Sequence, residues 1–221
     1  ANELKIKHLL IASSSSVYGA NLKIPYKEID ATQTQLSIYA STKKATESIA
    51  HSYSSLWKLP ITMLRFFTVY GPWSRPDMAP IKFAEAITKG NKVDIYNNGE
   101  MYRDFTYIDD VLKSITYLIS VPPKMIDKKD IDKNDSLSPV APFRIVNIGN
   151  SNKVKLLDFV EILESCLEKK AIRNYMPMQK GDVLATWANT DLLKKLTGYT
   201  PVTKLEDGLK KFVDWYNNHY K

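Results

Sequence analysis

Three short apolar runs stand out along the chain, at residues 6–12, 61–67 and 143–150. A continuous apolar run of this length, bounded by turn residues, is typical of a strand buried in a sheet. Polar segments follow the first two runs, at Ser13–Ser16 and Thr68–Tyr70, and the third run itself ends in the polar segment Asn147–Asn150. We therefore predict three buried strands, each of which ends in polar residues.

The segments between and after these runs show helical spacing of their apolar residues. At the start of the last helix, Thr203 and Glu206 have the spacing of a capping box. The predicted apolar faces comprise Ala45, Ile49, Tyr53, Leu56 and Trp57 within a helix at 37–57, and Leu205, Leu209, Phe212, Val213 and Tyr216 in the last helix. Further helices are predicted at 81–90, 106–120 and 155–170, and a polar surface loop at 123–139.

Strands that alternate with amphipathic helices predict an α/β fold with a parallel sheet. The carboxyl ends of parallel strands lie at one edge of the sheet, where ligands of such folds bind. The polar segments that follow the three apolar runs should therefore meet at that edge. This placement makes them candidate ligand-binding residues and argues against a plain linker.

Length and composition fit a globular protein. The 221 residues suffice for one ordinary domain or two small ones, and 44% of them are hydrophobic and 25% charged. No apolar stretch approaches the roughly 20 residues of a membrane-spanning helix. The single cysteine, Cys166, excludes an internal disulfide framework and fits a reducing compartment. We expect a cytoplasmic protein without membrane contact.

The charged residues do not by themselves identify a partner. The formal net charge is +7, and the lysines are scattered, which favours a solvated surface but leaves an anionic small molecule or a nucleic acid open. His8, His51 and His219 lack the spacing of metal ligands, so no metal site is predicted. Asp109 and Asp110 are interpreted as an exposed helix start.

Tyr39 and Lys43 are the first candidates for chemistry. Residues four apart on a helix lie on one face, so the phenol and the ammonium can be neighbours. A phenol ionises near pH 10, and a nearby cation favours the phenolate, which brings such a pair toward the range of a general base. No other tyrosine here has a lysine at the fourth following position. Spacing alone leaves an ordinary surface pair as the alternative.

Six segments, taken in order, resemble the extended short-chain dehydrogenase/reductase family. They are the serine run with VYG (13–19), YASTKKATE (39–47), LRFFTVYGPWSRPD (64–77), RDFTYIDD (103–110), NIGNS (147–151) and GDVLAT (181–186). Within that family the chain looks most like the NAD-dependent nucleotide-sugar 4-epimerases, in particular those that act on UDP-glucuronate. The resemblance implies the C-terminal part of a doubly wound Rossmann-type parallel sheet plus a smaller α/β nucleotide-sugar-binding domain.

The resemblance also implies catalytic and cofactor roles. Tyr39 would be the base on the sugar 4-hydroxyl, Lys43 would bind the nicotinamide ribose of NAD and activate Tyr39, and Ser14 would assist the proton transfer. Tyr39 and Lys43 would thus contact the cofactor, together with Ser13 near the nicotinamide and Phe66 beside it. The implied reaction oxidises C4 with bound NAD, rotates the 4-keto sugar and returns hydride to its other face.

A second set of residues would contact the UDP-sugar. A guanidinium fork suits phosphate oxygens, so Arg103 is expected at the diphosphate. The other implied contacts are Ser15 and Ser16 near the sugar, Ile95 and Tyr96 beside the uracil, and Asp182 on the ribose.

Two departures from the galactose-epimerase pattern point to a hexuronate substrate. Thr68 stands where that pattern has Asn, and the WSRPD run with Arg75 is additional. In the glucuronate enzymes the matching Thr and Arg hold the sugar carboxylate. Oxidation at C4 of a glucuronate gives a β-keto acid that tends to lose CO₂, so anchoring the carboxylate would suppress that loss. The alternative for Arg75 is a solvent-facing loop residue beside Asp77.

Sister activities fit less well. Related dehydratases and decarboxylases carry an acidic residue just before VYG, where this chain has Ser14–Ser16. We therefore expect conversion of UDP-glucuronate to UDP-galacturonate, in a pathway of polysaccharide biosynthesis. Another UDP-sugar 4-epimerase or a UDP-glucuronate decarboxylase is the alternative among enzymes. An inactive nucleotide-sugar-binding or dimerisation module is the alternative outside enzymes.

The cofactor signature of the family, a glycine-rich turn between a first strand and helix, does not occur in this sequence. We therefore expect an incomplete fragment that binds NAD weakly alone and forms a homodimer or depends on a missing N-terminal half. Residues 1–75 and 101–150 would be the remaining dinucleotide-binding domain with the catalytic motif. Residues 76–100 and 151–221 would form the substrate domain. No nucleic-acid partner is expected.

Overall fold

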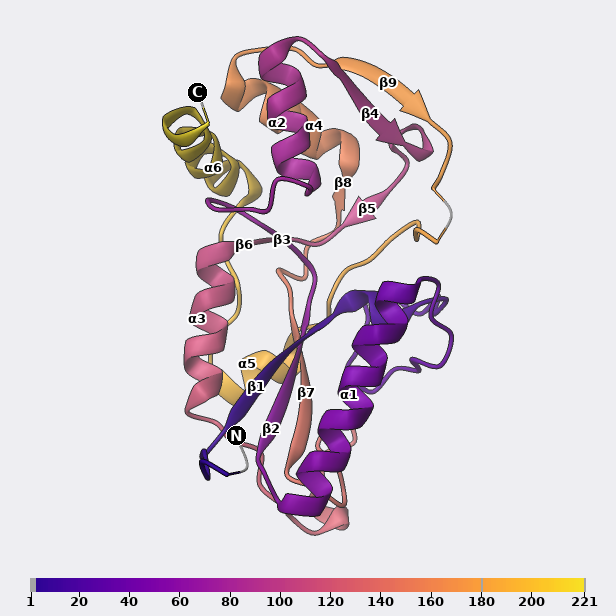
Figure 1. Cartoon of the computed structure of the whole chain (residues 1–221), viewed down its shortest axis with the longest axis vertical. Helices are drawn as coiled ribbons and strands as arrows, with labels where there is room; N and C mark the ends of the chain where they lie inside the picture. The colour runs from indigo at the N-terminus through magenta and orange to yellow at the C-terminus, as the bar shows by residue number, and fades with distance from the viewer. Residues whose placement is uncertain (1–2, 180, 221) are drawn as a thin grey trace.

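The computed structural model describes residues 3–179 and 181–220, and its elements fall into two groups (Figure 1). The first group is built on a three-stranded parallel sheet in the order β1-β2-β7. Its strands are β1 (Leu9–Ser14), β2 (Ile61–Phe66) and β7 (Phe143–Ile148). The predicted α/β class and the three strands are confirmed, although β1 starts later than predicted and includes two serines of the serine run.

Helices cover both faces of this sheet. α1 (Ile38–Trp57) packs on one face, and α3 (Ile108–Ile119) packs with α5 (Asp191–Thr197) on the other (Figure 1). Because side chains alternate along a strand, Ile61 and Met63 join the core under α1, while Leu64 joins the core under α3 and α5. The sheet therefore separates two apolar cores.

β1 is less buried than the sequence suggests. Within the described residues it pairs with β2 alone, so Leu9, Leu10 and Ile11 keep partial exposure and the prediction of a fully buried strand is wrong here. The apolar face predicted for α1 is also exposed. Its members include Ile49 at 60%, Tyr53 at 49%, Leu56 at 70% and Trp57 at 48% exposure, whereas the buried side carries Ala40, Glu47, Ala50 and Ser54.

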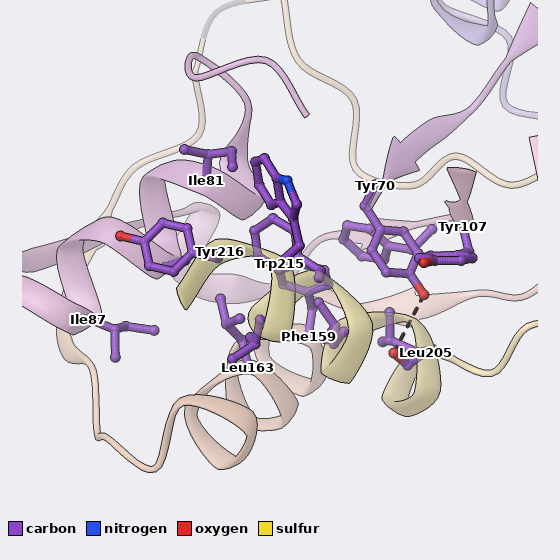
Figure 2. Close-up of a cluster of buried hydrophobic side chains, with 14 of the residues drawn as sticks. Tyr70, Ile81, Ile87, Tyr107, Phe159, Leu163, Leu205, Trp215 and Tyr216 are labelled. Carbon is purple, nitrogen blue, oxygen red and sulfur yellow. Dashed lines mark hydrogen bonds between the residues drawn. The ribbon is translucent and has the colours of Figure 1, made fainter. Parts of the chain in front are cut away.

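The second group surrounds a parallel strand pair, β4 (Lys92–Tyr96) with β9 (Ile172–Met176). Its helices are α2 (Ala79–Lys89), α4 (Leu156–Leu167) and α6 (Leu205–His219). Their shared core is rich in aromatic side chains, and Figure 2 shows Tyr70, Phe159, Trp215 and Tyr216 among them. The Tyr70 hydroxyl also donates to the Leu205 carbonyl over 3.5 Å, which ties the start of α6 to this core.

Two short strand pairs lie between the groups. β3 (Thr68–Tyr70) runs parallel to β6 (Phe105–Tyr107), and β5 (Tyr102–Arg103) runs antiparallel to β8 (Val154–Lys155). β3 follows β2 after a single residue, so the chain passes directly from the first sheet toward the second group (Figure 1). These short pairs carry several of the predicted site residues.

Two details at the predicted helix starts differ from the structure. The pattern at 106–120 begins inside β6, and α3 starts at Ile108. Lys204 is the N-cap of α6 and makes no side-chain cap, so the expected capping box is absent from this part of the structure. The Asp110 carboxylate instead accepts hydrogen bonds from the N–H groups of Val202 and Thr203. Asp110 is 2% exposed, so its interpretation as an exposed helix start is also wrong.

The other predicted helices are confirmed. α1, α2 and α4 lie at the predicted places within a few residues, and α2 ends at Gly90, whose φ of 71° lies in the left-handed region that favours glycine. No helix among the described residues is long and apolar enough to cross a membrane.

Candidate active site

The carboxyl ends of the three parallel strands form one row. The register aligns Ser14 of β1 with Phe66 of β2, and Phe66 with Ile148 of β7. One residue earlier, Ser13, Arg65 and Asn147 are aligned in the same way. Polar groups of the first and third runs are therefore gathered at the carboxyl ends of the sheet, as the parallel order requires, whereas Thr68–Tyr70 continues into β3 and pairs with β6.

A buried ion pair lies beneath this row. The Arg65 guanidinium donates to both carboxylate oxygens of Glu47 on α1, over 2.8 Å and 2.9 Å, and Ser13 Oγ donates to the same carboxylate over 2.7 Å. Burial alone would raise the pKa of Glu47, but the hydrogen bonds and charge of Arg65, with Ser13, hold it below its ordinary value. Ser13 therefore uses its hydroxyl to attach β1 to α1.

A second buried network joins the VYG segment to β7. The Tyr18 hydroxyl donates to Asn147 Oδ1 over 2.7 Å, and its ring stacks on Tyr26 with centroids 4.4 Å apart. The Glu28 carboxylate accepts a hydrogen bond from the Asn147 N–H over 2.9 Å. Burial raises the pKa of Glu28 to about 7, because the interior disfavours the charged form. These contacts fix the serine run and the loop after it against the strand ends.

Tyr39 and Lys43 lie on one face of α1, beside the end of β1. Ser37 caps the helix by accepting the Ala40 N–H over 3.1 Å, so Tyr39 stands in the first turn. Lys43 Nζ donates to the Ala12 carbonyl over 3.1 Å and lies 6.0 Å from the centre of the Tyr39 ring. Tyr39 is 54% exposed. The helix thus presents an accessible phenol and a held ammonium next to the strand that carries the serines.

Ser14 ends β1 and caps the short 3₁₀ helix that follows it, Ser15–Tyr18. Its Oγ accepts the Ser16 N–H over 3.2 Å and donates to Ser16 Oγ over 3.1 Å. Ser15 is partly buried and Ser16 is exposed. Ser14 follows Ala12 by two positions, and Ala12 is the residue that Lys43 contacts. The three predicted catalytic residues therefore share the end of β1.

A cavity of about 440 Å³ opens in the second group. Four predicted substrate residues line it, namely Thr68, Tyr96, Arg103 and Asp182. Arg103 Nη2 donates to Asp182 Oδ1 over 2.6 Å. Burial lowers the pKa of Arg103, and the neighbouring Asp182 carboxylate opposes that shift. The cavity wall therefore combines a partly buried guanidinium, a carboxylate and a hydroxyl.

The remaining predicted site residues lie elsewhere. Ile95 is fully buried in the core of the second group, and Phe66 packs against the core under α3 and α5. Arg75 is exposed on its loop, where it donates to Asp77 over 3.1 Å. Tyr39, Lys43 and Ser14 are not among the residues that line the cavity. The roles assigned to these residues by resemblance stay predictions.

Sequence reasoning missed part of the cavity wall. Lys82 and Phe83 of α2, Lys92 of β4 and Gln179 also line it. α2 was predicted as a helix, but nothing in its spacing indicates which face meets a ligand. Gln179 lies three residues before Asp182, a proximity that could have suggested it.

Comparison with known proteins gives consistent matches. A family model described as the NAD dependent epimerase/dehydratase family matches residues 1–132. A Rhizobium meliloti (strain 1021) protein named "Probable UDP-glucuronate 4-epimerase" is 50% identical over 222 residues, covering 100% of this chain and 65% of its own length. UDP-glucuronate 4-epimerase 2 of Arabidopsis thaliana is 46% identical over 214 residues, covering 95% of this chain and 48% of its own.

A solved structure agrees with these sequence matches. The UDP-glucuronic acid 4-epimerase from Bacillus cereus, in complex with UDP-glucuronic acid and NAD, superposes with a TM-score of 0.82 at 29% identity. The match covers 98% of this chain and 63% of that one. The chain thus spans less than two thirds of the length of each of these three relatives.

Proposed function

This chain belongs to the NAD dependent epimerase/dehydratase family, and we propose that it carries the UDP-sugar-binding and catalytic residues of a UDP-glucuronate 4-epimerase. One observation carries the proposal: the Arg103–Asp182 pair lines a cavity whose wall also includes Thr68. In such a wall the Arg103 guanidinium can bind a diphosphate, the Asp182 carboxylate can accept from ribose hydroxyls, and the Thr68 hydroxyl can contact the sugar. The relatives named for UDP-glucuronate 4-epimerisation support the choice of substrate.

The cavity suits the nucleotide end of the substrate. Arg103 would bind the diphosphate, with Lys82 and Lys92 adding positive charge to the same wall. Asp182 would accept hydrogen bonds from the ribose, and Tyr96 would lie beside the uracil. Ile95, whose side chain is buried, would contact the base only through its backbone.

Proton transfer would take place at the end of β1. Tyr39 would take the proton of the sugar 4-hydroxyl, and the adjacent Lys43 ammonium would favour the phenolate. Ser14 would hydrogen-bond the same hydroxyl, while Ser15 and Ser16 would contact the sugar. Each of these groups except Ser14, which is 9% exposed, is at least partly accessible to a ligand.

The residues at this edge fit the nicotinamide–ribose end of NAD. Lys43 and Tyr39 present an ammonium and a phenol beside the strand end, where a ribose can be bound, and Ser13 and Phe66 stand in the adjoining rows of the sheet. The chemistry that NAD supplies when bound is the removal and return of hydride at C4. The sequence contains no glycine-rich strand-to-helix turn, so we assign no residue to the NAD diphosphate.

The sugar carboxylate would be held by Thr68 and Arg75. Thr68 lies at the cavity wall, and Arg75 is four residues after Gly71 on an exposed loop. Arg75 would have to exchange its Asp77 partner for the carboxylate of the ligand. That exchange costs little, because exposed ion pairs contribute only about 0–1 kcal/mol.

Three further proposals concern the chain as a whole. The exposed apolar face of α1 supports a homodimer through this helix, or contact with an N-terminal half that would extend the sheet beyond β1.

The division into 1–75 with 101–150 and 76–100 with 151–221 is proposed with one qualification, since α5 packs on the first sheet. A cytoplasmic location is consistent with the single cysteine.

Ligand titration followed by product analysis tests the function. Calorimetry with UDP, UDP-glucuronate and UDP-glucose should show binding of all three and preference for the hexuronate. With NAD added, UDP-glucuronate should yield UDP-galacturonate, identified by NMR. Release of CO₂ with formation of UDP-xylose would instead indicate a decarboxylase. Binding without turnover in any NAD concentration would favour the inactive binding module.

A further inference from the structure

Asp104 is a fully buried carboxylate directly after Arg103. Its exposure is 0%, and four donors converge on its two oxygens. Oδ1 accepts from Thr106 Oγ1 over 3.1 Å and from the Asn150 N–H over 2.7 Å. Oδ2 accepts from the Ser151 and Ala188 N–H groups, each over 3.0 Å. The proposed reaction uses none of these contacts.

The donor set suits a carboxylate better than an amide. A carboxylate only accepts hydrogen bonds and can serve four donors, whereas an amide replaces one oxygen with an NH₂ group. In Asp104→Asn the NH₂ group would replace either Oδ2, which accepts two N–H groups, or Oδ1, which accepts one N–H group and one hydroxyl. In either position the NH₂ group would repel an N–H donor. Burial raises the pKa of Asp104, and the hydrogen bonds from Ala188, Asn150, Thr106 and Ser151 oppose that shift.

Asp104 connects segments that line the cavity. Its carbonyl accepts the Thr68 N–H over 3.0 Å, which places Thr68 at the wall. Its carboxylate accepts a hydrogen bond from the Ala188 N–H. Ala188 ends a segment, residues 182–188, that we call the strap. Asp182 at the other end of the strap pairs with Arg103. Between these ends, Tyr102 exchanges backbone hydrogen bonds with Leu184 and Thr186.

Gly149 leaves room for this arrangement. A Cβ atom at Gly149 would lie 2.6 Å from the Ala188 Cβ and 2.8 Å from Asp104 Oδ2, both closer than real Cβ contacts. An alanine at this position would therefore push the strap away from Asp104 without removing the carboxylate. The close approach of three segments depends on the smallest residue at the meeting point.

We propose that Asp104 is a positioning residue that holds Arg103 and the strap in the geometry that binds a nucleoside diphosphate. Asp104 makes no contact with the cavity itself and acts through its neighbours. The Arg103 side chain lines the cavity, while the Asp104 side chain points the other way, toward its four buried donors, because successive side chains of an extended segment alternate. The inference rests on the proposed nucleotide site and adds a residue that none of the comparisons assigns.

Calorimetry with UDP and with uridine tests the positioning role. In Asp104→Asn, UDP should bind about tenfold more weakly or worse, while uridine, which lacks the diphosphate and keeps only the ribose contact of Asp182, should lose clearly less affinity. Gly149→Ala should shift the two ligands in the same unequal way. An unchanged UDP affinity, or an equal loss for UDP and uridine, would overturn the proposal.

Asp110→Asn is the matched control. Asp110 is also a buried carboxylate and accepts three hydrogen bonds, from Tyr199, Val202 and Thr203, but it lies outside the elements that carry Arg103 and the strap. This variant should lower stability and leave both ligand affinities within about threefold. A UDP-selective loss in this control would show that any buried defect has the effect, and would overturn the proposal.

Hydrogen exchange of the ligand-free protein separates this inference from the proposed function. In Asp104→Asn the Thr186 and Val183 amides of the strap should exchange faster than in wild type, and in Asp110→Asn they should not. If wild type binds no UDP, the proposed function fails. The inference then depends on this measurement alone, and unchanged exchange in Asp104→Asn would overturn it.

Discussion

Arg65 and Glu47 form a two-pronged ion pair in the interior of the protein, with side chains 1% and 2% exposed. The pair joins the central strand β2 to α1, one helical turn after Lys43. Lys43 and Ser13 add two further attachments between α1 and β1. The orientation of the helix that carries Tyr39 is therefore set by charge as much as by apolar packing, since its buried side carries Glu47, Ser54 and two alanines.

Glu47→Gln should destabilise the fold by about 3–5 kcal/mol, because removal of one partner leaves the Arg65 charge buried and unpaired. Urea unfolding followed by tryptophan fluorescence measures the change. The matched control is Glu85→Gln, which breaks the exposed Lys89–Glu85 pair and should leave stability nearly unchanged. Equal losses in the two variants would contradict the role assigned to the buried pair.

Glu28 should make the free energy of unfolding fall as pH rises. Its pKa of about 7 in the folded protein lies above its ordinary value of 4.5, so the native state holds a proton that the unfolded chain releases. Stability from this group is present below about pH 4.5 and is lost through about pH 7, by up to about 3 kcal/mol. The free energy of unfolding should therefore differ more between pH 5 and pH 8 in wild type than in Glu28→Gln. An identical difference in the two proteins would refute the raised pKa of Glu28.

The strands and longer helices could be predicted because their patterns are local. The runs around Ile61 and Phe143 are mostly apolar, and Gly90 marks the end of α2 where a left-handed residue is needed. The exposure of β1 could not be predicted, since it depends on which strands lie beside Leu9–Ser14. The capping box failed for a related reason, because a distant carboxylate, Asp110, takes the Thr203 N–H.

In the candidate site, too, local contacts could be predicted from the sequence and long-range contacts could not. Tyr39 and Lys43 could be predicted to be neighbours because one helix turn separates them, and their distance of 6.0 Å agrees. The Arg103–Asp182 pair joins residues 79 positions apart, and no local pattern predicts such a contact. Only the resemblance to the nucleotide-sugar epimerases indicated that both residues contact one ligand. Asp104 drew no attention in the sequence, because its importance arises from donors on three different segments.

Tyr39→Phe should abolish turnover and leave the fold intact. The ring is half exposed and keeps its contact with Lys43, so the free energy of unfolding should change by less than about 0.5 kcal/mol. Loss of a general base slows a reaction by about 10²–10⁴-fold. The measurement is conversion of UDP-glucuronate with NAD added, together with the affinity for UDP, which should be unchanged. Activity within about threefold of wild type would remove Tyr39 from the mechanism.

Arg75 offers the sharpest test of substrate choice. Because its side chain is 73% exposed and its ion pair with Asp77 is exposed as well, Arg75→Gln should change stability by less than about 0.5 kcal/mol. The affinity for UDP should be unchanged, since Arg75 is not among the residues that line the cavity. If Arg75 binds the sugar carboxylate, the affinity for UDP-glucuronate should fall by about tenfold while that for UDP-glucose stays within about threefold.

Asp77→Asn is the matched control, because it breaks the same ion pair and keeps the guanidinium. Asp77 itself lines the cavity, so the effect of this variant on UDP-glucuronate is read relative to its effect on UDP. An Arg75 released from Asp77 should bind UDP-glucuronate as well as wild type or better, so the two variants should move the hexuronate affinity in different directions. Calorimetry with the two sugar nucleotides and the three proteins measures this. Parallel losses in both variants would mean that the loop needs the ion pair for its shape. A preference for UDP-glucuronate that survives Arg75→Gln would place carboxylate recognition elsewhere in the chain.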